Sequence, residues 1–204
     1  MRSGWAEARD AYRAAAERFL ATVRLVGDRW DEPGLGEWDV RALVGHTTRS
    51  FLTVEEYAAT PADAIRVDSP VEYYRAARAI AAGPGVAQRG RDAGAALGDD
   101  PVAAVTAIAE RVLPVLDRHD GTEVVQTIVG GMRFADYLPT RVFELAVHTA
   151  DLAVALGEPV DVPPAAAEMA LSIVAGLAVH DGRAGDLLLA ATGRSGLPVG
   201  FSVL

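Results

Sequence analysis

The stretch "TRVFELAVHTADLAVALG", residues 140–157, carries the pattern that decides how this chain folds. Apolar residues return at helical spacing along one flank of it, which predicts a helix. We expect this helix to begin somewhere in 134–140 and to end at Gly157, because glycine commonly follows the last helical residue. The apolar flank should face the interior of a helical bundle. Its residues are Val142, Leu145, Ala146, Leu152 and Ala153.

The opposite flank of the same helix is polar. Glu144 and His148 lie four residues apart, and Arg141 and Asp151 extend their face by three residues on either side. Residues three or four apart on a helix share one face. Two interpretations stay open at this point. The four side chains form ion pairs on the surface, or they line a polar cavity in which Glu144 and His148 bind a divalent metal.

A metal site needs at least one further ligand, and the chain has four histidines. His119 and His180 each end a predicted helix, where a cation suits the helix dipole, so we expect both at the surface. His46 lies in the middle of a predicted helix, at the edge of its apolar face. This position is compatible with a hydrogen-bonded core histidine, or with a third ligand beside Glu144 and His148.

Two histidines and one carboxylate would leave coordination positions open, which is typical of catalytic rather than structural metal sites. Zinc is the first candidate metal, and nickel, iron and manganese are alternatives. Asp151 is placed to orient a ligand imidazole through its other nitrogen. The chain contains no cysteine, which excludes disulfides and a protein thiolate. Any thiol that takes part must therefore come from outside the chain.

The rest of the chain predicts further helices joined by connections rich in glycine and proline. Apolar residues at spacings of three and four predict a long helix over 5–27, and Asp39 and Asp100 are good N-caps for two others. This pattern indicates an all-α bundle of four main helices, with accessory helices and a short extended C-terminal tail. The other predicted segments are a helix from about residue 70 that breaks at 83–85, an extended stretch at 122–134, and a last helix over about 164–180.

Length and composition limit the class of protein. With 204 residues, half of them hydrophobic, the chain can bury one substantial core. We assign residues 1–160 to the helical bundle, and residues 161–204 to a short helix and tail packed on it. A net charge of −9 without a basic stripe argues against nucleic acid as a partner. No signal peptide and no membrane-spanning apolar run are recognisable, so we expect a cytoplasmic protein with small-molecule partners.

Two segments carry a resemblance to a known family. They are "GEWDVRALVGHTTRSF", residues 36–51, and "GMRFADYLPTRVFELAVHTADLAVALG", residues 131–157. Together they resemble the mycothiol-dependent maleylpyruvate isomerase family, which belongs to the DinB-like superfamily of metal-binding four-helix bundles. The family's pattern is a Trp-x-Val before a helix that carries a histidine, followed later by an Arg-x-x-Glu-x-x-x-His-x-x-Asp helix. The matching residues here are Trp38, Val40, His46, Arg141, Glu144, His148 and Asp151.

The resemblance implies a DinB-like bundle and a divalent metal, with zinc as the first candidate, held by His46, Glu144 and His148. Family members use the metal to bind and activate mycothiol, a low-molecular-weight thiol, which then adds to an electrophilic carbon. The implied function is therefore a metal-dependent enzyme that uses mycothiol as nucleophile or cofactor, of the S-transferase or isomerase type. The alternative is a bundle that binds a metal or a small molecule for regulation, without catalysis.

Further residues are candidates by position alone. We expect Arg49, Ser50, Arg141 and Asp151 either to contact the thiol or its electrophilic substrate, or to orient the metal ligands. Trp38 is expected to pack at the entrance of its helix, with the mouth of the site as a second possible location. The characterised isomerase has a substantial second domain, whereas only a helix and a short tail follow residue 160 here. We therefore expect a thiol S-transferase, or a family member with a different reaction, rather than a maleylpyruvate isomerase.

Overall fold

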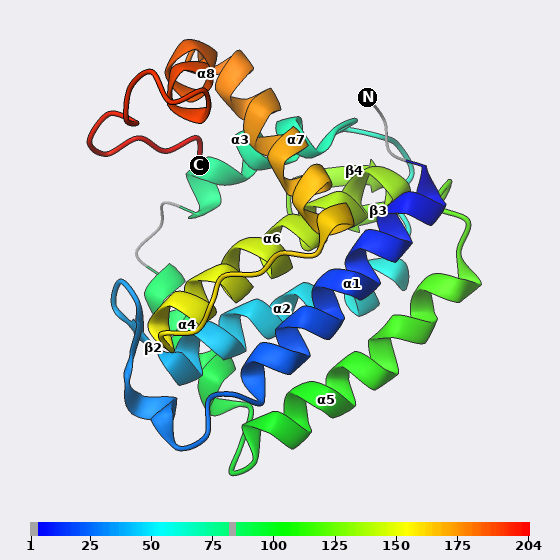
Figure 1. Ribbon diagram of the computed structural model, residues 1–204. Helices are drawn as coiled ribbons and strands as arrows, with labels where there is room; N and C mark the ends of the chain where they lie inside the picture. Colours follow the sequence, from blue (N-terminus) through cyan, green and yellow to red (C-terminus); the bar gives the residue numbers. More distant parts are fainter. Residues whose placement is uncertain (1–3, 82–84) are drawn as a thin grey trace.

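Four long helices form the body of the molecule in the computed structural model, which describes residues 4–81 and 85–204 (Figure 1). Helix α6 packs against α1 and α2, and α5 also contacts both α1 and α2. The predicted all-α bundle is therefore confirmed. The four helices are α1 (Trp5–Val23), α2 (Val40–Ala58), α5 (Pro101–Val112) and α6 (Phe134–Ala155).

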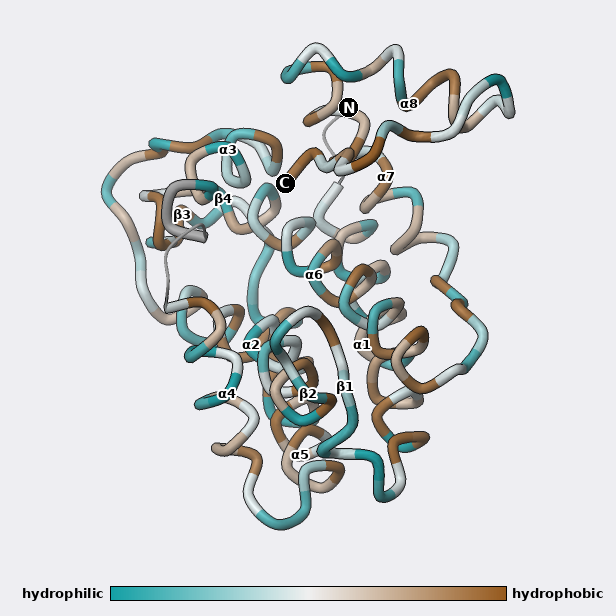
Figure 2. Tube along the Cα trace, turned by 90° about the vertical axis from the view of Figure 1, so that its left-hand side faces the viewer, coloured by the Kyte–Doolittle hydropathy of each residue, from teal (hydrophilic) through white to brown (hydrophobic). Residues whose placement is uncertain are grey.

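Four shorter or outer helices complete the described structure. Helix α3 (Pro70–Ala81) packs on α6 and α7, α4 (Val86–Ala95) packs on α2, and α7 (Pro164–His180) packs on α1 and α6. Helix α8 (Ala184–Ala191) contacts α7 and, with the tail behind it, projects from one end of the bundle (Figure 2). The accessory helices and the short extended tail are thus present as predicted. The division of the chain at residue 160 stays a prediction.

The starts of two bundle helices follow from their capping residues. The Asp39 carboxylate accepts a hydrogen bond from the Ala42 amide at 2.7 Å, and Asp100 accepts one from the Ala103 amide at 3.0 Å. Each carboxylate satisfies an amide that has no partner within the first helical turn. Both predicted N-caps are therefore confirmed. The helix predicted over 5–27 is shorter than expected, because α1 ends at Val23.

The connections contain two small antiparallel hairpins. A 3-10 turn, η1 (Arg29–Asp31), and strands β1 (Pro33–Leu35) and β2 (Trp38–Asp39) occupy the loop before α2. A 3-10 helix, η2 (Leu113–Arg118), follows α5, and strands β3 (Val124–Thr127) and β4 (Gly130–Arg133) form the segment predicted to be extended. These are the only sheets in the described part of the chain. The predicted break at 83–85 falls mostly on residues 82–84, which lie outside the described residues.

Helix α6 is the central helix, and this location decides how its two flanks are used. Its apolar flank is buried as predicted, with Leu145 and Leu152 fully covered. The polar stripe is not on the surface either, since Arg141 is only 8 % exposed. Helices α2 and α3 also pack on α6, so most of both flanks is covered, and Val154 near its end is the one exposed residue of α6. Surface ion pairing is therefore the wrong interpretation of the stripe.

Within residues 4–81 and 85–204, no helix is both long and apolar enough to cross a membrane.

Candidate metal centre

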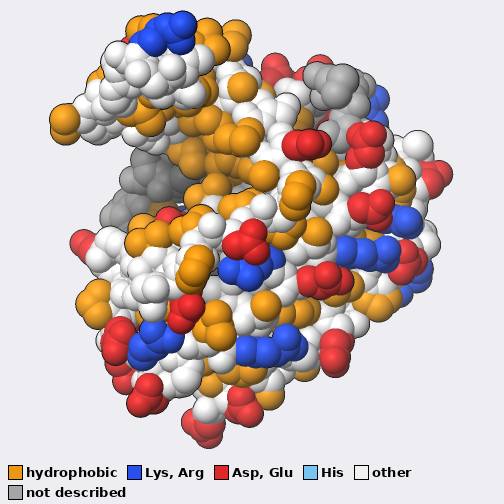
Figure 3. Space-filling view, in the orientation of Figure 1, with side chains coloured by type: hydrophobic (Ala, Val, Ile, Leu, Met, Phe, Trp, Pro, Cys, Tyr) orange, Lys and Arg blue, Asp and Glu red, His pale blue; other side chains and the backbone are white. Residues whose placement is uncertain are grey.

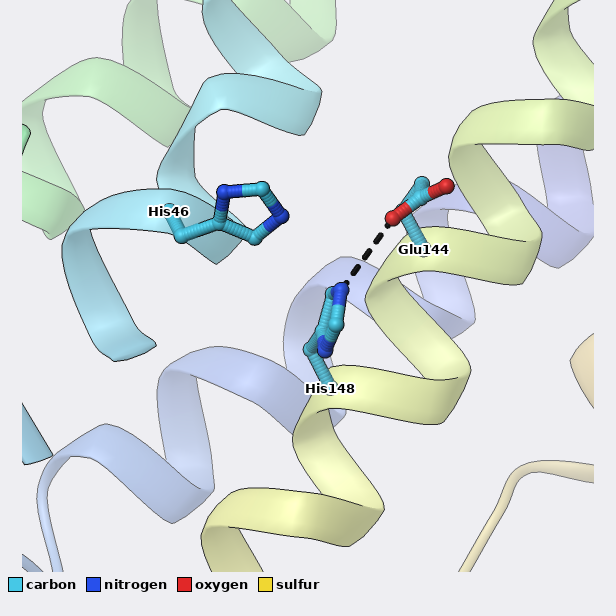
Figure 4. A group of neighbouring side chains, drawn as sticks. All are labelled: His46, Glu144 and His148. Atoms are coloured by element: carbon cyan, nitrogen blue, oxygen red, sulfur yellow. Dashed lines mark ion pairs between the residues drawn. The ribbon is translucent and has the colours of Figure 1, made fainter. Parts of the chain in front are cut away.

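The three side chains predicted as metal ligands meet where α2 packs against α6. Glu144 and His148 come from successive turns of α6 and lie opposite His46 on α2 (Figure 4). Each residue offers one ligand atom, and the three atoms all lie within 4.8 Å of one another. All three residues are partly buried. The fold thus brings residues from two distant segments of the chain into one cluster.

Glu144 is held by partners on both of its carboxylate oxygens. Oε2 lies 3.2 Å from Nε2 of His148, and Oε1 accepts a hydrogen bond from the Tyr74 hydroxyl at 2.8 Å. A guanidinium nitrogen of Arg141 lies 4.0 Å from the same Oε1. Burial would raise the pKa of Glu144, but the hydrogen bond from His148 and the charge of Arg141 outweigh it and lower that pKa to about 2. The carboxylate is therefore ionised at neutral pH.

His148 lies between two carboxylates. Its Nε2 faces Glu144, and its Nδ1 lies 3.0 Å from Oδ2 of Asp151. Burial would lower the pKa of His148, but the hydrogen bonds to Asp151 and Glu144 outweigh it and raise that pKa to about 9. The contact with Asp151 holds the ring with its Nε2 towards Glu144.

His46 is packed between two aromatic rings. The Trp38 ring lies 4.5 Å from it, centroid to centroid, and the His148 ring lies 5.0 Å away in an edge-on arrangement. Burial and the nearby His148 lower the pKa of His46 to about 4. The imidazole is therefore neutral at pH 7, which is the form that binds a metal.

The residues present fit a divalent metal. A neutral imidazole and an ionised carboxylate are ready to act as ligands, and one proton has to leave His148. The Nδ1 of His46 is buried without a hydrogen-bond partner among the described residues, so the structure does not use this ring as a hydrogen-bonded core histidine. Two atoms bound to one zinc lie at most about 4.2 Å apart. Glu144 and His148 already meet this limit at 3.2 Å, and the ligand atom of His46 lies within 4.8 Å of both.

The cluster lines a pocket of about 820 Å³. Such a volume accommodates a small-molecule ligand, because ligand pockets typically measure about 300–1,000 Å³. Four arginines line the pocket, and Glu144 is the one acidic lining residue in the described part of the chain. In a protein with a net charge of −9, the pocket is thus locally positive and suited to anions. The four arginines are Arg49, Arg78, Arg89 and Arg141.

Arg141 is held in a cage of tyrosines beside the cluster. Its guanidinium lies 5.4 Å from the centre of the Tyr73 ring and 5.2 Å from that of Tyr137, so both rings make cation–π contacts. Its Nε donates a hydrogen bond to the Thr140 hydroxyl at 3.0 Å. These contacts keep a positive charge next to Glu144 in the interior, and they limit the positions that this charge can take.

The comparisons with known proteins identify the family of this bundle. The family model of the mycothiol maleylpyruvate isomerase N-terminal domain matches residues 10–153. The chain belongs to this family. Comparison with curated proteins and with solved structures gives no match. The matched range contains His46, Glu144, His148 and Asp151, and it ends before α7 begins. The match confirms the family and the DinB-like bundle that the two quoted segments indicate.

The other sequence-based candidates lie in different places around this family's bundle. Arg49 and Ser50 line the pocket on α2, and Trp38 lines it too while packing at the start of that helix. His180 is exposed as predicted and pairs with Asp181. His119 corrects the prediction of a surface residue, because only 19 % of its side chain is exposed. His119 directly follows the 3-10 helix η2, so its position at a helix end is as predicted. Its ring packs on Phe134, and its Nδ1 lies 2.9 Å from a carboxylate oxygen of Glu123, which explains the low exposure.

Sequence reasoning missed the contribution of α3. Tyr74 hydrogen-bonds Glu144, and its neighbour Tyr73 contacts Arg141. Both tyrosines also line the pocket. The two adjacent aromatic residues in "PVEYYRAARA" were the available signal, but no spacing rule links them to α6. Their role depends on how α3 packs in three dimensions.

Proposed function

We propose that this chain is a metal-dependent enzyme that uses mycothiol as nucleophile or cofactor, in a reaction of the S-transferase or isomerase type. The observation that carries the proposal is the cluster of His46, Glu144 and His148 on the wall of a pocket of about 820 Å³. The family of the chain supports the thiol, because its description names mycothiol. Zinc is the metal that we expect, with nickel, iron and manganese as alternatives.

This proposal accounts for both the ligand cluster and the absence of cysteine from the sequence. His46, Glu144 and His148 would hold the divalent metal, and its positive charge would lower the pKa of a bound thiol towards neutral pH. The chain has no cysteine of its own, so the nucleophilic sulfur belongs to the bound thiol. Asp151 keeps the Nε2 of His148 facing the cluster, and Tyr74 holds the Glu144 carboxylate in place. Such outer contacts fix the orientation of metal ligands.

The rest of the pocket supports an electrophile that carries negative charge. Arg141 reaches the pocket beside the ligand cluster, while Arg49 and Arg89 line it as exposed side chains. In our proposal, Arg141 faces the reacting part of the electrophile, and Arg49 and Ser50 contact either the thiol or the electrophile. Charge that develops on the electrophile during thiol addition would be stabilised by the Arg141 guanidinium, which is already held in place.

Elemental analysis of protein purified without chelator or added metal is the first test. We expect about one zinc per chain in the unaltered protein, and loss of that metal in the His46→Ala variant. The matched control is His180→Ala, which removes an exposed histidine outside the cluster and should leave the metal content unchanged. Absence of metal from the unaltered protein, even after incubation with zinc, would refute the proposal.

Turnover is then measured with mycothiol and a set of anionic electrophiles, by following loss of free thiol. Conjugate formation that needs both the metal and His46 supports an S-transferase. Rearrangement of the electrophile without consumption of thiol supports an isomerase. A protein that holds its metal but turns over no electrophile would be the regulatory or binding bundle instead.

A further inference from the structure

The last described residues of the chain form part of the pocket wall. After α8 the chain runs outward and then returns beside α3 (Figure 1). Residues 201–204, here named the strap, lie at this return point. Leu204 lines the same pocket as Ala77 and Arg78 of α3 and the candidate metal ligands. In Figure 3 the C-terminal region overhangs a hollow on this side of the molecule.

Two arginines hold the strap. Arg78 donates a hydrogen bond to the Val203 carbonyl at 2.8 Å and also pairs with Asp181 at the end of α7. Arg183 donates a hydrogen bond to the Ser202 carbonyl at 2.7 Å. The guanidinium of Arg183 also lies 4.2 Å from the centre of the Phe201 ring, as a cation–π contact. These contacts hold Phe201, Ser202 and Val203 beside α3 and the connection between α7 and α8.

Val203 adds an apolar anchor to these polar contacts. Its side chain is only 8 % exposed and belongs to the main hydrophobic core cluster. By contrast, every residue from Gly193 to Gly200 is exposed. The strap is therefore a small docked segment at the end of a solvated linker. Release of the strap would break the contacts of Arg78, Arg183 and Val203 but no hydrogen bond within a helix.

The docking position couples the strap to the candidate metal centre. Arg78 lies four residues after Tyr74 on α3, so the two side chains share one face of that helix. Tyr74 hydrogen-bonds Glu144, while Arg78 holds Val203. Successive turns of one face of α3 thus carry the hydrogen-bond donor to Glu144 and the hydrogen-bond donor to Val203.

We propose that the strap determines the size of the ligands that reach the pocket. The contact of Val203 with Arg78 holds Leu204 in the pocket wall. In this docked state small ligands enter, whereas bulky ligands enter only when the strap is released. The segment thus acts as a specificity determinant at the outer end of the site. This inference deepens the proposed function, because it concerns the same pocket, but it does not depend on which metal or thiol binds there.

Access to the pocket can be measured without metal or thiol cofactor, because the chain has no cysteine. A Thr53→Cys variant places one thiol in the pocket lining. Its rate of alkylation is measured with iodoacetamide as the small reagent and fluorescein maleimide as the bulky one. The strap is then released in this background by Val203→Asp, which charges the buried anchor, or by Arg183→Ala, which removes a tether outside the pocket.

Strap release should speed labelling by the bulky reagent and leave labelling by iodoacetamide unchanged. If the strap of the unaltered protein is released about one-tenth of the time, permanent release would raise the rate of labelling by the bulky reagent about tenfold. Val199→Asp is the matched control, because it introduces the same charge at a fully exposed residue of the same tail. A Glu110→Cys probe on the exposed side of α5 checks that the reagents themselves behave alike in every variant.

Equal labelling by the bulky reagent in docked and released variants would overturn the proposal, provided that circular dichroism shows both to be folded. An equal rise with both reagents would also overturn it, since the pocket would then have loosened without size selection. The labelling test of the strap and the metal-binding test of the proposed function can fail independently of each other. Loss of metal binding would refute the enzyme while leaving the labelling rates as they are, and unchanged labelling rates would refute the strap while leaving the metal site intact.

Discussion

Gly45→Ala is expected to destabilise the bundle and to disturb the candidate metal centre together. Gly45 immediately precedes His46 on α2 and lies against the backbone of α4. A Cβ atom at residue 45 would come within 2.2 Å of the Gly94 amide nitrogen and 2.4 Å of the Ala93 carbonyl carbon. Relaxed contacts between such atoms lie at about 3.5 Å or more. Because both atoms belong to the backbone, the clash cannot be relieved by rotating a side chain.

The two helices would therefore have to separate by roughly an ångström. Overpacking costs about 1–3 kcal/mol, and a clash with backbone atoms belongs in the upper part of that range, at about 2–3 kcal/mol. The better helix propensity of alanine returns about 1 kcal/mol of it. We expect a net loss of about 1–2 kcal/mol in the free energy of unfolding. The shift also reaches the candidate site, since Trp38 packs between Gly90 of α4 and the His46 ring.

Urea denaturation in the presence of a chelator isolates the packing effect from any effect of bound metal. Gly185→Ala is the matched control, because Gly185 lies in α8 with no atom within 4 Å of its added Cβ. That substitution should be neutral or slightly stabilising. Zinc affinity, measured by competition with a chromophoric chelator, should fall at least about tenfold in Gly45→Ala. A Gly45→Ala protein as stable as the unaltered chain would refute this reasoning.

Three further predictions concern the contacts around the ligands. Tyr74→Phe removes the hydroxyl that holds Glu144 and should lower zinc affinity about tenfold in the same competition assay, with no loss of helix content; unchanged affinity would contradict a positioning role. Asp151→Asn keeps the shape of the side chain but not its charge, so the pKa of His148, followed by NMR, should fall from about 9 towards its ordinary value; a pKa that stays high would show that Asp151 is not its main support. Because the folded pKa of His148 lies above the unfolded one, its contribution to stability is complete below about pH 6.5 and is lost as the pH rises towards 9. Chelated protein should therefore lose stability over that window in urea titrations, and His148→Gln should abolish the effect.

The helices and their starts could be predicted from the sequence because those signals are local. Apolar spacing defines a helix wherever it lies in the chain, and Asp39 and Asp100 need only the next three residues to act as caps. The pairing of Glu144 with His148 is equally local, since helical geometry alone places them on one face. The residues alone left His46 with two possible roles, a core histidine or a third ligand, because nothing within either helix states that α2 and α6 are neighbours. The family pattern was needed to choose the second.

The remaining features depend on packing that the sequence does not state. A helix with one apolar and one polar flank usually exposes the polar one, which makes surface pairing the simplest interpretation of Arg141, Glu144, His148 and Asp151. The structure differs because α3 crosses over that flank and supplies Tyr74. The connection that carries α3 has no pattern that links it to α6. The strap is likewise invisible in the sequence, since "GFSVL" has no feature that predicts docking on Arg78.

Burial of four ionisable groups on one helix should destabilise the bundle, and the order of their charges explains why it is tolerated. Along α6 the signs alternate: Arg141 is positive, Glu144 negative, His148 positive in its protonated form, and Asp151 negative. Each buried charge thus has an opposite neighbour within 4.0 Å, which offsets part of its desolvation. The proton on His148 puts a positive charge between Glu144 and Asp151. A metal bound at His148 would put its positive charge at the same place. Exchange of that proton for a divalent metal would keep the alternation and add His46, whose neutral ring already has one unprotonated nitrogen. The same arrangement that lets the chain bury a polar stripe therefore also prepares it to bind a cation.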